Sequence, residues 1–162
     1  MITGRICLML LTASAPLLPL ASPLVAAEAA PARKLQGRFD PVSKHCLRQL
    51  AVALATKYIA EDEPLPAKAS GLGLDSSAWV IQGAGTPAPK DAAAIDAGAG
   101  DFIYNSALAG KRWSAAANLP IACEKPGLWA DGHVNVLKGD GSVVSLKGDF
   151  KTPEDVFKAA SK

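Results

Sequence analysis

A glycine-centred hairpin near the C-terminus constrains the fold of this chain most strongly. Two β-rich runs flank a Gly-Asp-Gly triplet within residues 132–146, a pattern typical of antiparallel hairpins. A two-residue loop would mix polar and apolar side chains on both faces. A three-residue loop collects the apolar residues on one face, because side chains alternate along a strand, and gives two apolar pairs: Val136 with Val144, and Val134 with Leu146.

We therefore predict a structural turn made of Gly139, Asp140 and Gly141. Asp is favoured before Gly in such turns. Gly141 falls where a type I turn with a G1 bulge requires a positive φ, which glycine adopts without strain.

The first 27 residues are typical of a secretory signal peptide. Arg5 precedes an apolar run, and small residues up to Ala27 fit a cleavage site. A membrane anchor is the alternative, because the apolar run is about long enough to span a bilayer, although its prolines argue against a stable spanning helix. We expect an exported protein, periplasmic or extracellular, with no stable membrane span after signal removal, beginning with a flexible lead-in at 28–39.

Residues 40–162 fit one domain in length. The formal net charge of the chain is only +2 at pH 7, which leaves no electrostatic footprint for nucleic acid. Asp40-Pro41 is a typical helix start, and helical spacing of apolar side chains predicts an amphipathic helix to about residue 60. Its apolar stripe is formed by Leu47, Leu50, Leu54 and Tyr58.

Short strands are predicted at 77–82, 101–105 and 119–124, the last at a sheet edge because it contains Pro120. Residues 83–100 are mostly Ala, Gly and Pro, so we expect a mobile loop there. Thr152-Pro153 begins a short final helix. The predicted class is α+β: an N-terminal amphipathic helix on a small antiparallel sheet that ends in the C-terminal hairpin, with the leucine stripe on the Val134/Val136/Val144/Leu146 face.

Few residues are candidates for chemistry. Asp131, His133 and Asp140 lie in or beside the hairpin and could serve a Ca²⁺ ion, although calcium prefers six or more oxygen ligands; the alternatives are turn chemistry for Asp140 and a polar surface role for His133. No cofactor is otherwise expected. Trp113 and Trp129 fall in loop-like segments and form a possible interaction surface, with core filling as the alternative.

Cys46 and Cys123 are candidates for a disulfide in an exported protein. The alternative is that both are small buried residues, and the spacing does not decide between them. A Cys123/His133 hydrolase pair is a weaker hypothesis, since the sequence offers no orienting third group. We expect no enzymatic activity.

Five stretches of the chain belong together in a further comparison: residues 46–54, 61–66, 101–104, 123–127 and 131–143. They resemble bacterial type II secretion pseudopilin-like proteins of the H-X9-DG family found in planctomycetes and verrucomicrobia. The resemblance implies a pseudopilin-like globular fold without the prepilin leader, and protein partners in the cell envelope or secretion machinery. On this basis we expect an exported structural or interaction protein, with a small ligand- or Ca²⁺-binding periplasmic module as the alternative.

Overall fold

The computed structural model of the chain describes residues 34–61 and 63–162. The predicted signal peptide, and the predicted lead-in up to residue 33, lie outside the described residues. The rest of the lead-in is structured: Leu35 pairs with Trp129 in a parallel bridge, and Gly37–Phe39 forms a 3-10 turn. Among the described helices, none combines the length and apolar character that a membrane crossing requires.

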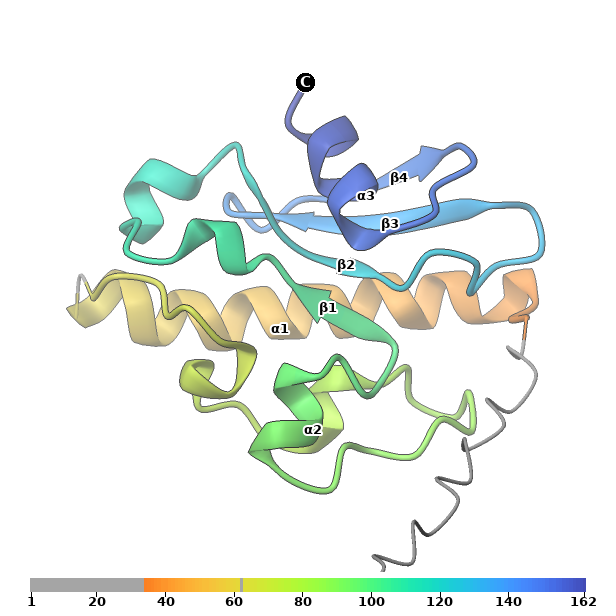
Figure 1. Cartoon of the computed structure of the whole chain (residues 1–162), viewed down its shortest axis with the longest axis horizontal. Coiled ribbons are helices and arrows are strands. Elements are labelled where there is room, and N and C mark those ends of the chain that lie inside the picture. The colour runs from red at the N-terminus through yellow and green to blue at the C-terminus, as the bar shows by residue number, and fades with distance from the viewer. Residues whose placement is uncertain (1–33, 62) are drawn as a thin grey trace, which may run out of the picture. The chain divides into compact units, whose positions relative to one another are not determined.

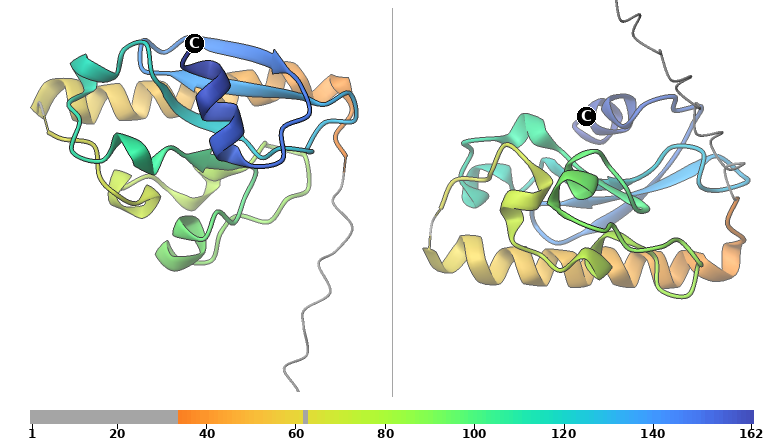
Figure 2. Two further views of the ribbon diagram at one scale, coloured as in Figure 1. Left: turned by 45° about the horizontal axis from the view of Figure 1, so that its top comes forward. Right: turned by 60° about the horizontal axis from the view of Figure 1, so that its bottom comes forward.

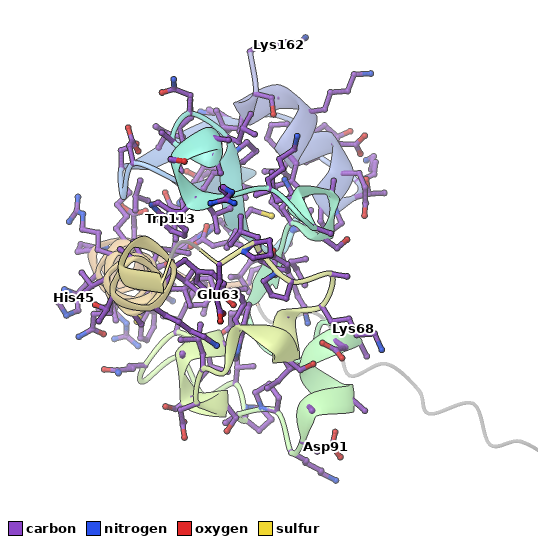
Figure 3. All side chains as sticks on the ribbon, turned by 90° about the vertical axis from the view of Figure 1, so that its left-hand side faces the viewer. His45, Glu63, Lys68, Asp91, Trp113 and Lys162 are labelled. Carbon is purple, nitrogen blue, oxygen red and sulfur yellow. The ribbon has the colours of Figure 1, made fainter. Side chains whose placement is uncertain are left out.

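The first helix, α1 (Asp40–Glu61), is the longest described element. It covers the predicted range and continues directly from the 3-10 turn. Leu47, Leu50 and Leu54 are at most 2% exposed, so the predicted stripe is the buried face of the helix. The opposite side faces solvent, and Figure 3, which looks along α1, shows His45 there.

Four antiparallel strands form one sheet in the order β1-β2-β3-β4. Their bounds are β1 Phe102–Tyr104, β2 Pro120–Glu124, β3 His133–Lys138 and β4 Val143–Lys147. The fold is therefore α+β, as predicted. The prediction that Pro120 places its strand at an edge is wrong: β2 is an inner strand. Pro120 is its first residue, and the register shifts between Pro120 and Ala122, a position where a strand tolerates proline.

The predicted hairpin register is confirmed. Val136 pairs with Val144 and Val134 with Leu146, while Asn135 lies opposite Ser145. Gly141 has a φ of 82°, and its N–H donates to the Lys138 carbonyl at 3.0 Å. Local turn chemistry thus determines this part of the fold.

The sheet lies between two helices, with α1 on one face and α3 (Pro153–Ala160) on the other (Figures 1 and 2). The predicted contact between the leucine stripe and the Val134/Val136 face is wrong. That face packs against Val156 and Phe157 of α3. α3 begins at a capping box formed by Thr152 and Asp155. Because α3 covers the Val134/Val136 face, α1 packs on the other face of the sheet.

The segment between α1 and β1 differs most from prediction. Instead of a strand at 77–82, the 3-10 helix Ser76–Trp79 begins there, with the Asp75 carboxylate accepting from the Ser77 N–H. Within 83–100 the chain forms the short helix α2 (Ala92–Asp96), so this stretch is not irregular throughout. Asp96 accepts hydrogen bonds from the N–H and hydroxyl of Ser70. The mobility expected for 83–100 stays a prediction.

Candidate functional site

The most unusual group in the described structure is the carboxylate of Glu124. It ends β2, is completely buried, and points toward α1. Its oxygens accept four hydrogen bonds from neutral donors: the Ser43 hydroxyl, the Trp129 indole Nε1 at 2.6 Å, and the backbone N and side-chain Nδ2 of Asn135 at 2.6 and 3.1 Å. The carboxylate therefore connects α1, the loop after β2, and β3.

Asn135 extends this connection in two further directions. Its Nδ2 also donates to Asp40 Oδ1 at 2.9 Å, and its Oδ1 accepts from the Ser145 hydroxyl at 2.6 Å. An amide side chain has both donors and an acceptor, so this buried residue can bridge two carboxylates on one side and a hydroxyl on the other. Asn135 thus ties β3 to β4, β2 and α1 at one point.

The network reaches solvent at His133. Its Nδ1 lies 2.6 Å from Asp131 Oδ1, and its Nε2 lies 3.3 Å from Asp40 Oδ1. The imidazole stacks on the Trp129 ring, with centroids 4.6 Å apart and an interplanar angle of 21°. Lys44 Nζ lies 2.7 Å from the other Asp40 oxygen. The first turn of α1 therefore meets the start of β3 at Asp40, which lies against both Asn135 and His133.

Burial and hydrogen bonding act in opposite directions on the carboxyl groups of this network. Burial raises the pKa of Glu124, and its four donors oppose that rise because they favour the ionised form. At Asp40, partial burial disfavours the charge, but hydrogen bonds from Lys44 and Asn135 hold its pKa below the usual value. The hydrogen bond from His133 lowers the pKa of Asp131.

The arrangement around Glu124 is that of a structural joint. A catalytic acid or base must come within hydrogen-bonding distance of a reacting group. Glu124 has no exposed surface, and its acceptor positions are occupied by groups of the protein itself. Its geometry supports the linking of helix to sheet rather than contact with a substrate.

The three residues suggested as a metal site do not meet. Asp131 and His133 lie at the start of β3, whereas Asp140 follows its end, which places it about 20 Å along the strand. There the Asp140 carboxylate accepts from the Ser142 N–H at 2.9 Å, the turn role considered as its alternative. Across residues 34–61 and 63–162, no three His, Cys, Asp or Glu side chains are grouped to hold a metal ion.

Cys46 and Cys123 are free, buried thiols in the structure. Cys46 lies in the apolar cluster that includes the α1 stripe. Cys123 lies in the other cluster, on the α3 side of the sheet. A disulfide would require one side chain to change faces, so the pairing stays a prediction without support from this geometry.

The proposed Cys/His pair is likewise separated by the sheet. Cys123 faces α3, whereas His133 contacts Asp40 of α1. Burial, with a smaller effect from the Glu124 charge, raises the pKa of the Cys123 thiol well above its usual value. A buried thiol of this kind is a poor nucleophile, since the thiolate is the reactive form.

Trp113 and Trp129 do not form the exposed surface considered for them. Their side chains are 7% and 2% exposed. Trp113 lies in the core near α1 (Figure 3), and Trp129 is held by Glu124 and His133. The short segments around them appear loop-like in sequence, but both tryptophans fill the core.

Glu124, Asn135 and Ser43 were not identified from the sequence as a central group. A glutamate inside the apolar run 119–124 was the available signal, because a buried acidic residue requires partners. The partners themselves come from segments up to 95 positions apart, as in the Asp40–Asn135 contact. Only the tertiary structure brings them together.

Comparison with known proteins identified no relative. The chain matches no protein-family model, no curated protein and no solved structure.

Proposed function

We propose that this chain is an exported structural or interaction protein with a pseudopilin-like globular domain, associated with a type II secretion or pilus-like system of the cell envelope. The main support for the proposal is the structural role of residues within the stretches that resemble this family. Glu124, His133 and Asn135 all belong to those stretches, and all three serve the joint between α1 and the sheet.

The Asp-Gly turn, another part of the resemblance, also has a structural role. The Asp140 N–H donates to the Ala117 carbonyl at 2.8 Å, and the Gly139 N–H donates to the Leu119 carbonyl at 3.0 Å. The turn is therefore docked onto the segment before β2. Motif residues that position elements of the fold support a scaffold with partner-binding surfaces over an enzyme.

The test combines location, mass and partner. The full chain is produced in a bacterium that has a type II secretion system, the envelope is cross-linked, and the chain is recovered for intact mass and adduct identification. We expect a product that begins near Glu28, found outside the cytoplasm and cross-linked to components of that secretion system. The matched control lacks residues 1–27 and should stay in the cytoplasm without these adducts.

A chain recovered from the cytoplasm with residues 1–27 intact would contradict export. A correctly exported chain whose adducts contain no secretion component would contradict the proposed association.

A further inference from the structure

Within residues 34–61 and 63–162, strand β4 is an edge of the sheet with no strand paired to its outer side. In the hairpin, Lys138 N–H donates to the Ser142 carbonyl at 2.9 Å, so Lys138 and Ser142 form a hydrogen-bonded pair. Alternate residues of an antiparallel strand point their backbone groups in opposite directions. Val143, Ser145 and Lys147 therefore direct their N–H and C=O groups away from β3, and no other described segment bonds to them.

The opposite edge of the sheet is not open in this way. Just before β1, Asp101 N–H donates to the Trp79 carbonyl, and the Asp101 carboxylate accepts from Ile81 N–H and Thr86 Oγ1, each at 2.8 Å. The segment from Trp79 to Thr86 is thus fixed beside the start of β1. Proteins commonly protect exposed edges with covering loops, prolines, bulges, short strands or charged side chains. Among the described residues, β4 has no covering loop, proline or bulge, and its one charged side chain is Lys147 at its end.

The side chains of β4 are also incompletely covered. Val144 and Leu146 point to the face that α3 covers, but they are only partly buried. α3 crosses the sheet and contacts β2 and β3 as well as β4, so it covers β4 only in part (Figure 2). An additional strand along β4 would cover both apolar side chains and bond the three free backbone positions.

We infer that the occupant of this edge is a second copy of the chain, paired antiparallel through β4 about a twofold axis at Ser145. This register alone pairs all three outward residues with one another: Ser145 with its own counterpart, and Val143 with Lys147. It places Val144 opposite Leu146 in an apolar pair, and it places no like charges opposite each other, a favourable combination for cross-strand contacts. The self-complementary pattern favours a second copy over an unrelated strand, and the inference does not depend on the function proposed above.

The first experiment measures the mass of the full chain by sedimentation equilibrium across a concentration series. We expect twice the chain mass at high concentration. Lys147→Pro removes an outward N–H at an exposed position and should leave the chain monomeric, while Lys147→Ala keeps that N–H and should dimerise like the unmodified chain. A chain that is monomeric throughout the series, or a Lys147→Pro variant that dimerises equally well, would overturn the inference.

The second experiment tests the register independently of any folding defect in the proline variant. Ser145→Cys and Asp149→Cys are compared under mild oxidation, each in a Cys7→Ser background; Cys46 and Cys123 are buried. Residues facing across such a pair have Cα atoms about 5.5 Å apart, within disulfide range. Ser145→Cys should form a disulfide-linked dimer and Asp149→Cys, with a side chain 83% exposed, should not. Equal cross-linking of the two would contradict the Ser145-centred pairing.

Discussion

Glu124 is held in the interior by neutral donors rather than by a cation. A buried carboxylate is costly unless its hydrogen bonds are made, and here four donors from Ser43, Trp129 and Asn135 supply them. Because these donors come from separate segments, the carboxylate is satisfied only when helix, loop and β3 are all in place. The residue therefore favours one arrangement of the core over alternatives.

Replacing Glu124 by Gln should lower the free energy of unfolding by about 1–3 kcal/mol, the cost of leaving a buried donor without its acceptor. The amide places an NH₂ group where the carboxylate accepts, so at least one donor loses its partner. Urea unfolding measures the change. The matched control is Glu63→Gln at an exposed position, which should stay within about 0.5 kcal/mol of the unmodified chain; equal effects from both substitutions would contradict the joint.

Asp40 makes the stability of the fold dependent on acid. Its pKa is lowered in the folded state, so its contribution is present above the unfolded pKa of about 3.9 and is lost as the pH falls through the folded value. Asp40→Asn should therefore cost about 1 kcal/mol at neutral pH, and progressively less as the pH falls below the unfolded pKa and through the lower folded pKa. Urea unfolding of the unmodified chain and of Asp40→Asn from neutral to acid pH should give free energies of unfolding that converge as the pH falls. A difference that stays constant with pH would contradict a stabilising role for the ionised Asp40 carboxylate.

The hairpin turn is positioned by close backbone packing. A Cβ on Gly139 would lie 2.2 Å from the Ala116 carbonyl oxygen, and backbone cannot move aside as a flexible side chain can. Gly139→Ala should therefore destabilise the chain by about 1–3 kcal/mol. The control is Gly37→Ala, because a Cβ at that position would have open space. Thermal unfolding measures both variants, and equal melting temperatures would contradict the close packing of the turn against Ala116.

Local chemistry made some elements predictable from sequence and left others undetermined. The hairpin register and the Thr152 cap follow from residues within a few positions of one another. The partner of α1 does not: within the hairpin, the face with Val134 and Val136 is the more apolar one, yet α1 packs on the face with Asn135 and Glu124. Hydrophobic pattern identifies a buried face but does not say which of two helices covers it.

At the scale of the whole molecule, the region between α1 and β1 was least predictable. Its 3-10 helices bury Leu72 and Trp79 in the core, and polar contacts such as Asp96 with Ser70 and Asp101 with Thr86 add to that packing. Their sequences lack the periodic apolar spacing from which helices and strands are recognised. The candidate joint was unpredictable for a related reason, since its residues are individually ordinary and become informative only when they are brought together.

The location of the two described cysteines gives a test of the layer arrangement. Because Cys46 and Cys123 lie in different apolar clusters, we expect both to resist alkylation in the folded chain and both to react after unfolding without reductant. Intact mass after each treatment counts the adducts. Protection that persists after unfolding and disappears on reduction would instead establish the disulfide and contradict the packing of Cys123 against α3.

The fixing of α1 to the sheet through Glu124 is best tested by a double-mutant cycle between Ser43 and Glu124. The free energy of unfolding is measured for Ser43→Ala, for Glu124→Met, which keeps the side-chain length, and for the double variant. If the hydroxyl–carboxylate bond joins helix to sheet, the two substitutions will be coupled by about 1 kcal/mol or more. Additivity within about 0.5 kcal/mol would mean that Glu124 does not hold α1 through Ser43.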